Sequence, residues 1–136
     1  MKNYIHKVQY YETDRMGITH HSNYIRWMEE ARMDFLEQIG WPYEKLEEEK
    51  IISPVTSIDC KYRKTTTFAD EIEIEVMVKE FKGIRLILSY TMKKVGDGNL
   101  VCTGQSEHCF LDDKGQIIRL NKVYPELGEL LDRLSQ

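Results

Sequence analysis

Residues 12–42 read ETDRMGITHHSNYIRWMEEARMDFLEQIGWP and join a polar loop to one long amphipathic segment. From Asn23 onward the apolar residues recur near the spacing of one helix face, at Tyr24, Trp27, Met28, Ala31, Phe35 and Ile39. Gly40, followed by Trp41 and Pro42, is a stop signal for such a helix. The stretch therefore predicts a single long helix whose heavy apolar face must be covered by a broad second layer.

Segments with a strand-like pattern lie on both sides of this helix. Residues 4–12 (YIHKVQYYE) are short and rich in aromatic and β-branched residues, which favours a strand. The charged stretch at 44–50 is expected to form a solvated helical turn or a loop. Beyond it the apolar residues recur with a period of two, which is the period of a strand. The strands predicted in this way cover residues 53–64, 71–80, 84–95 and 100–111.

Short polar turns separate members of this series of strands or follow the last one. They lie at residues 82–83, 96–99 and 112–115. Because parallel neighbours would need long crossovers, such turns predict an antiparallel meander of four strands. The C-terminal residues 124–136 place Pro125 where a first helical turn tolerates it and align leucines on one stripe, which predicts a short surface helix.

The order of these elements predicts an α+β fold in one domain that spans residues 1–136. A strand, one long helix, four strands and a short helix follow one another without an internal repeat. A single apolar helix and one curved antiparallel sheet can bury each other if the sheet wraps around the helix. One hydrophobic core is therefore expected.

The composition is typical of a soluble globular protein. The chain has 136 residues, of which 41% are hydrophobic and 31% are charged. Its net charge of −4 provides no basic field for nucleic acid, and no apolar run has the length of a signal peptide or a membrane span. We therefore expect a cytoplasmic protein. The three cysteines contain no CxxC pair and predict neither a disulfide framework nor a zinc site.

The loop and the helix entrance resemble one known family. The residues that carry the resemblance are Tyr11, Thr13-Asp14-Arg15-Met16-Gly17, His21, Tyr24 and Glu29-Glu30-Ala31-Arg32. Placed between a strand and a long helix, they resemble the hotdog-fold acyl-CoA thioesterases of the 4-hydroxybenzoyl-CoA thioesterase type. The element order matches that family up to about Asp112. The resemblance implies a hotdog fold and the hydrolysis of an acyl-CoA thioester.

The resemblance also implies that Asp14 is the catalytic carboxylate. Such a group could attack the thioester carbonyl to give a mixed anhydride, or deprotonate a water, and the sequence leaves both routes open. His21 is expected to assist, and N–H groups in the first turn of the helix are expected to stabilise the oxyanion. Gly17 is expected to allow a positive φ or close approach of a ligand. Tyr24 is expected either in the core or at the substrate.

A coenzyme A substrate carries phosphates, which an acidic protein must bind through a local basic cluster. Two clusters are candidates: Lys61, Arg63 and Lys64 at a strand end, and Lys82 with Arg85 around a turn. The resemblance favours the second, because related enzymes bind the nucleotide on the surface near such turns. Coenzyme A enters as part of the substrate, and no further cofactor is expected. His20 and His21 lack the spacing of a zinc motif, so no metal is expected.

Two other functions remain open for the same fold. A 3-hydroxyacyl-thioester dehydratase would use a histidine base such as His21 with Glu29 or Glu30 as the acid. A non-catalytic acyl-thioester binder would need neither. A Cys109–His108 pair is excluded because consecutive residues of a strand point to opposite faces.

Self-association is expected as well. A lone sheet exposes its edges, so a homodimer or homotetramer is predicted. In the family that the chain resembles, the acyl site lies at the subunit interface.

Overall fold

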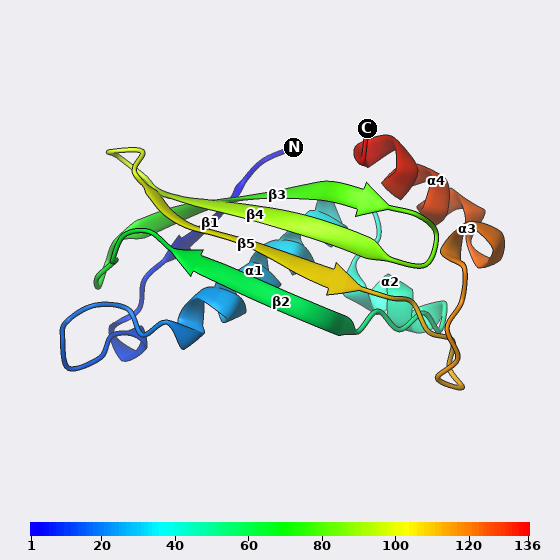
Figure 1. Cartoon of the computed structure of the whole chain (residues 1–136), viewed down its shortest axis with the longest axis horizontal. Helices are drawn as coiled ribbons and strands as arrows, with labels where there is room; N and C mark the ends of the chain where they lie inside the picture. The colour runs from blue at the N-terminus through cyan, green and yellow to red at the C-terminus, as the bar shows by residue number, and fades with distance from the viewer.

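The computed structural model describes residues 1–136 and contains a five-stranded antiparallel sheet with four α-helices (Figure 1). In chain order the elements are β1 (Tyr4–Lys7), the 3-10 helix η1 (Tyr10–Glu12), α1 (Ser22–Gln38), α2 (Tyr43–Glu48), β2 (Val55–Tyr62), β3 (Glu71–Phe81), β4 (Leu86–Lys94), β5 (Leu100–His108), α3 (Leu120–Val123) and α4 (Pro125–Leu134). The α+β class, the long helix and the C-terminal helix are confirmed.

The strands lie in the order β1-β3-β4-β5-β2, and every neighbouring pair is antiparallel. The predicted meander of four strands is therefore wrong for β2, which pairs with β5 and not with β3. The reason is that no tight turn joins β2 to β3: residues 63–70 carry the chain across the end of the sheet to its other side. The meander prediction holds for β3, β4 and β5.

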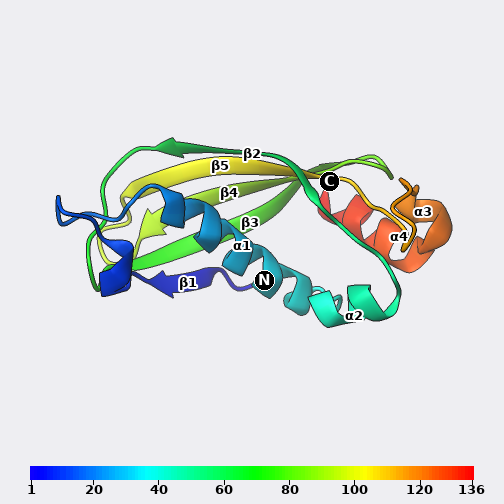
Figure 2. The ribbon, with the colours of Figure 1, turned by 90° about the horizontal axis from the view of Figure 1, so that it is seen from below.

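The sheet is curved and does not close on itself, and α1 lies along its inner face (Figure 2). Trp27, Met28 and Phe35 of α1 are buried against this face. On β3, Ile72, Ile74 and Val78 are buried while the alternate residues are half-buried or exposed, as the period of two predicts. Each fully buried side chain of this size contributes roughly 1.5–3 kcal/mol of hydrophobic stabilisation.

One glycine lies where the helix packs closely on the sheet. A Cβ atom at Gly104 on β5 would lie 2.4 Å from the carbonyl oxygen of Asp59 and 3.1 Å from Cε of Met28. No larger residue fits there without a shift of the β2 backbone. Gly104 is therefore explained by packing.

The first strand and the charged stretch at 44–50 differ from what the sequence predicts. β1 ends at Lys7, and the last residues of the predicted strand form the 3-10 helix η1 instead. The reason is a local hydrogen bond: the backbone N–H of Gln9 donates to the carboxylate of Glu12 at 2.8 Å and holds this segment in a turn. The charged stretch forms α2, which buries Leu46 in the core. The helix α3 has no counterpart in the predictions.

None of the helices combines the length and the apolar character needed to cross a membrane. No group of three or more His, Cys, Asp or Glu side chains is arranged to hold a metal ion. The three cysteines are free thiols.

Candidate active site

Asp14 begins a tight turn that leads towards α1. Its backbone N–H donates to the carbonyl of Ile18 at 2.9 Å, and its own carbonyl accepts from the N–H of Gly17 at 2.9 Å. Gly17 has a φ of +79°, so the expected positive φ is confirmed. The backbone N–H of Met16 donates to Oδ1 of Asp14 at 2.8 Å. The second carboxylate oxygen of Asp14 accepts no hydrogen bond within the chain, and the half-buried side chain borders an open hollow.

Glu12, two residues before Asp14, has a buried carboxylate that anchors this turn. Its Oε1 accepts hydrogen bonds from the backbone N–H of Gln9 and from Nε2 of His6, both at 2.8 Å, and its Oε2 accepts from Nε1–H of Trp27 at 2.7 Å. Burial alone would raise the pKa of Glu12, but these three hydrogen bonds outweigh it and hold the pKa below its usual value. Glu12 is therefore ionised at neutral pH and links β1, η1 and α1 beneath the turn.

Hydrogen bonds to the backbone of Glu12 also hold the start of α1 in place. The carbonyl of Glu12 accepts from the N–H of His20 at 2.8 Å and from Nδ2 of Asn23 at 3.0 Å. The N–H of Thr19 donates to the carbonyl of Thr66 at 2.8 Å, and the two threonine hydroxyls lie 2.6 Å apart. The crossing segment 63–70 thus packs directly against the loop that precedes the helix.

His21 is the last residue before the 17 residues of α1. Its imidazole is exposed and stacks on that of His20, with 4.3 Å between the ring centroids. Its carbonyl accepts a hydrogen bond from the hydroxyl of Tyr62 at 3.2 Å. Its backbone N–H donates no hydrogen bond within the chain. A free N–H is therefore presented at the positive end of the long helix.

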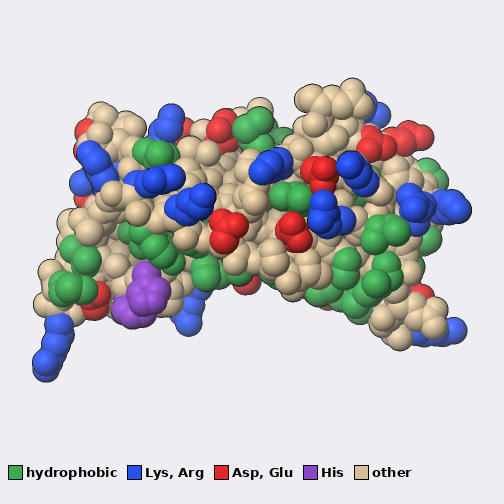
Figure 3. Space-filling view, in the orientation of Figure 1, with side chains coloured by type: hydrophobic (Ala, Val, Ile, Leu, Met, Phe, Trp, Pro, Cys, Tyr) green, Lys and Arg blue, Asp and Glu red, His purple; other side chains and the backbone are tan.

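The single chain does not bring all predicted site residues into one hollow. Asp14 and Gly17 border a broad open hollow lined by Tyr10, Tyr11, Thr13, Arg15, Thr67 and Phe68. His21 borders a neighbouring hollow lined by Ile18, Thr19, Tyr24, Tyr62, Arg63, Lys64 and Thr65. No hydrogen bond joins Asp14 to His21. Figure 3 shows exposed histidine gathered at this end of the molecule.

Tyr24 belongs mainly to the core. Its side chain is 3% exposed, its ring packs on Trp27 with 4.6 Å between centroids, and its hydroxyl lies 3.0 Å from the hydroxyl of Thr66. Burial raises the pKa of Tyr24. Only the part of the ring that borders the hollow beside His21 can reach a ligand.

The two basic clusters lie at opposite ends of the sheet. Arg63 borders the hollow that contains His21. Lys82 and Arg85 flank the β3–β4 turn, which lies at the other end of the molecule from the Asp14 loop (Figure 1). Both pair with Glu80: Arg85 Nη2 lies 2.8 Å from Oε2 and Lys82 Nζ lies 3.4 Å from Oε1. The hydrogen bond from Arg85 lowers the pKa of Glu80 below its usual value, and the charge of Lys82 adds a smaller shift in the same direction.

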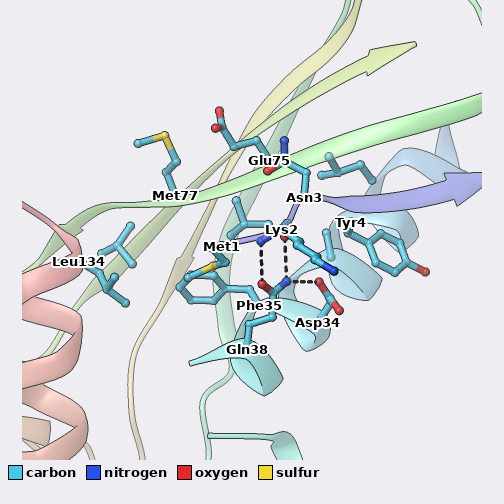
Figure 4. Close-up of a pocket in the computed structure, with 14 residues that line it drawn as sticks. Met1, Lys2, Asn3, Tyr4, Asp34, Phe35, Gln38, Glu75, Met77 and Leu134 are labelled. Atoms are coloured by element: carbon cyan, nitrogen blue, oxygen red, sulfur yellow. Dashed lines mark hydrogen bonds between the residues drawn. The ribbon is translucent and has the colours of Figure 1, made fainter. Parts of the chain in front are cut away.

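Another hollow, of about 220 Å³, contains none of the predicted site residues. It lies between the N-terminal residues, α1, β3 and α4 (Figure 4). The side chain of Gln38 bridges its rim, because it accepts from the N–H of Lys2 at 2.9 Å and donates to the Lys2 carbonyl at 2.8 Å and to Asp34 at 2.7 Å. These bonds fix the N-terminal segment over α1.

Reasoning from the sequence missed the anchor of the loop. The assignment of residues 4–12 to one strand placed Glu12 at the end of a regular strand and gave it no role. The signal was present in part, since Glu12 lies directly before the Thr13–Gly17 motif. His6 and Trp27, which complete the anchor, are brought to Glu12 only by the fold.

One long helix inside a curved antiparallel sheet is the architecture of hotdog-fold proteins, and in this chain an Asp-x-x-Gly turn leads towards that helix. Residues 8–131 match the model of the thioesterase-like superfamily. The chain belongs to this family, which confirms the resemblance seen in the sequence.

Individual relatives agree with this assignment. A protein of Aquifex aeolicus is 34% identical over 124 residues, which cover 91% of this chain and 94% of that protein. The 4-hydroxybenzoyl-CoA thioesterase of a Pseudomonas species is 22% identical over 130 residues, which cover 91% of this chain and 92% of that enzyme. The structure of a DHNA-CoA thioesterase from Staphylococcus aureus has a TM-score of 0.91 at 28% identity and covers 97% of this chain and 89% of its own.

Proposed function

We propose that the protein hydrolyses acyl-CoA thioesters and that the carboxylate of Asp14 drives the reaction. Membership of the thioesterase-like superfamily and relatives named as CoA thioesterases support the hydrolysis of a thioester. One observation carries the role of Asp14: one of its oxygens accepts no hydrogen bond, at the rim of an open hollow directly ahead of α1. Glu12, the other acid of the loop, is excluded because its carboxylate is buried and fully hydrogen-bonded.

Two routes lead from this carboxylate to the same products. In the first, the free oxygen of Asp14 attacks the thioester carbonyl, the bond to sulfur breaks, and CoA leaves as a thiolate; water then hydrolyses the mixed anhydride and restores Asp14. In the second, Asp14 takes a proton from a water that adds to the carbonyl. Both routes yield one free acid and one CoA.

The backbone N–H of His21 is the donor best placed to stabilise the oxyanion. It donates to no other group in the chain and lies at the positive end of α1. Loss of one such donor raises a barrier by about 3 kcal/mol. The imidazole of His21 is exposed beside the hollow and makes no hydrogen bond with Asp14. Its assistance is therefore a contact with the substrate and not with the carboxylate.

The phosphates of CoA are bound first by Arg63 and Lys64. Both are exposed and border the same hollow as His21. Lys82 and Arg85 lie at the far end of the sheet, so they reach the same nucleotide only from a second chain (Figure 1). Their ion pairs with Glu80 must then be shared with the phosphates.

The active unit is a homodimer or a larger assembly of such dimers. β2 is an outer strand of the sheet, and most of its residues are exposed. Unpaired N–H and C=O groups along such an edge favour pairing with another strand. Size-exclusion chromatography with light scattering tests this part of the proposal, and a monomer at micromolar concentration would contradict it.

The dehydratase alternative finds less support in the geometry. It requires an acid on the long helix near His21, but Oε1 of Glu30 is occupied by the hydroxyl of Tyr4 at 2.7 Å and by Nδ1 of His6 at 3.2 Å. Glu29 is exposed beside a different hollow.

A thiol-release assay tests the proposed function. Benzoyl-, 4-hydroxybenzoyl-, short-chain and long-chain acyl-CoA are incubated with the protein, and free thiol is measured with a chromogenic disulfide. Hydrolysis of at least one thioester is expected. An enoyl-CoA is tested in parallel: its hydration without thiol release would establish the dehydratase, and binding without either reaction would establish a non-catalytic acyl-thioester binder.

A further inference from the structure

Another cavity, partly open to the surface, lies away from the Asp14 loop. It has a volume of about 80 Å³ and is bounded by the C-terminal half of α1, by α2, by α4 and by the inner face of the sheet. Leu36, Leu46, Leu88 and Leu131 form much of its wall. None of the residues that line it borders either hollow at the Asp14 loop. The cavity is therefore separate from the proposed reaction site.

Arg32 is the one charged side chain in the wall of this cavity. It lies on α1 and is half-buried, yet no carboxylate lies within 4.0 Å of it. A guanidinium that is partly removed from water is ordinarily paired with an acid, because desolvation of an unpaired charge is unfavourable. The cavity thus contains a positive charge without a counter-charge.

The polar groups opposite Arg32 do not supply the missing negative charge. Nε2 of His108 lies 2.7 Å from the hydroxyl of Ser106, which lies 2.8 Å from the hydroxyl of Tyr90. Burial, together with the charge of Arg32, lowers the pKa of His108 to about 4, so this imidazole is neutral at pH 7. Burial likewise raises the pKa of Tyr90, although Ser106 and Arg32 oppose the shift, so its hydroxyl is neutral.

We propose that this cavity binds the carboxylate of a short aliphatic acid, with the head group on Arg32 and the tail among the leucines. A guanidinium forms two parallel hydrogen bonds with a carboxylate, and an apolar wall favours a hydrocarbon tail. An apolar pocket with a few convergent polar groups is the usual form of a small-molecule site. A bound acid would supply the counter-charge that the chain itself lacks. This site goes beyond the proposed hydrolysis.

Titration calorimetry of the intact protein with butyrate and hexanoate tests the proposal. Saturable binding of the acids is expected, and butyramide, which has nearly the same shape without the charge, should not bind. Arg32→Gln should weaken binding by about tenfold or more, since it removes the charge-assisted pair. Arg26→Gln is the matched control, because Arg26 lies on the same helix and is exposed, and it should leave the affinity unchanged.

Two further variants keep the test decisive. Leu36→Phe retains Arg32 but fills the cavity, so it should also weaken binding, and it decides the matter if Arg32→Gln does not fold. Asp14→Asn should bind the acids like the wild type, which separates this site from the proposed reaction site. No saturable binding of either acid, equal binding of butyramide, or undiminished affinity in a folded Arg32→Gln or Leu36→Phe protein would overturn the proposal.

Discussion

Two turns with the same Asp-x-x-Gly pattern lie at opposite ends of the molecule, at residues 14–17 and 112–115 (Figure 1). In both, the aspartate N–H donates at 2.9 Å to the carbonyl four residues ahead, and the glycine N–H donates back to the aspartate carbonyl at 2.9 and 3.0 Å. In both, Oδ1 accepts the N–H two residues ahead, at 2.8 and 2.9 Å. The glycine φ values are +79° and +80°. The local pattern therefore produces the same turn twice.

The surroundings of the two turns differ. Two residues before Asp14 is the buried, ionised Glu12, whereas two residues before Asp112 is Phe110, which packs edge-on against Phe81 with 6.2 Å between centroids. The first turn leads into the free N–H at the start of the 17-residue α1, and the second leads into the four-residue α3. Only the first turn thus leads into a long helix. The same pattern makes a turn at both places, and the surroundings distinguish the turn of the proposed site from the other.

The sharpest test of this comparison exchanges each aspartate for asparagine. Asp14→Asn should lower kcat/KM for the best acyl-CoA by about 10³-fold, because an amide can neither attack the thioester nor accept a proton from water. Asp112→Asn makes the same change in the same turn and should leave kcat/KM within about twofold of the wild type. Both proteins should unfold at the same temperature within a few degrees. Equal activity of the two variants would end the assignment of Asp14.

The anchors of the two turns should respond differently to pH. Glu12→Gln removes the charge that three donors surround and should reduce the free energy of unfolding by about 2 kcal/mol at pH 7. The folded-state pKa of Glu12 lies below the usual 4.5, so its contribution is complete above that pH and disappears as the pH falls through the folded value. Urea unfolding between pH 6 and pH 3 should show this loss in the wild type and less of it in Glu12→Gln.

Phe110→Leu is the matched change at the second turn. It should destabilise the protein by about 1 kcal/mol through lost packing, by the same amount at every pH in that range. If Glu12→Gln behaves in the same pH-independent way, the anchor of the first turn is not electrostatic.

The two basic clusters offer a smaller contrast between the ends. Arg63→Gln should raise KM for an acyl-CoA about fivefold with kcat nearly unchanged, because it removes a contact to phosphate that is equal in the ground state and the transition state. The effect should shrink as salt is raised. Arg85→Gln should raise KM only in the assembled oligomer. A raised KM in Arg85→Gln together with an unchanged KM in Arg63→Gln would place the nucleotide at the other end of the sheet.

The smallest expected effect concerns the two glycines. Gly17→Ala and Gly115→Ala should each cost about 1 kcal/mol of stability, since both force alanine into a left-handed conformation and neither Cβ meets an atom within 4 Å. Thermal unfolding should give the same loss for both. Only Gly17→Ala should also lower kcat, because it alone shifts a carboxylate at the proposed site. A clear difference in stability would show that the turns are not equivalent.

Much of the fold could be predicted because its signals are local. The apolar positions from Tyr24 to Ile39 and the alternation in β3 each lie within one element, so their periods identify a helix and a strand. The place of β2 in the sheet could not be predicted. Its partner, β5, is far away in sequence, and residues 63–70 contain no turn signal that excludes one neighbour or the other.

By itself the sequence determined the long helix, the C-terminal helix, most of the strands, the turn at Asp14 and the family resemblance, because backbone conformation in a turn or a helix depends on residues a few positions apart. Only the tertiary structure decided that Glu12 is buried beneath the turn, that His6 and Trp27 donate to it, and that Arg32 points into a cavity without an acid. Charges acquire their roles from the solvent and partners around them, and those are set by residues that the chain brings together only when it folds.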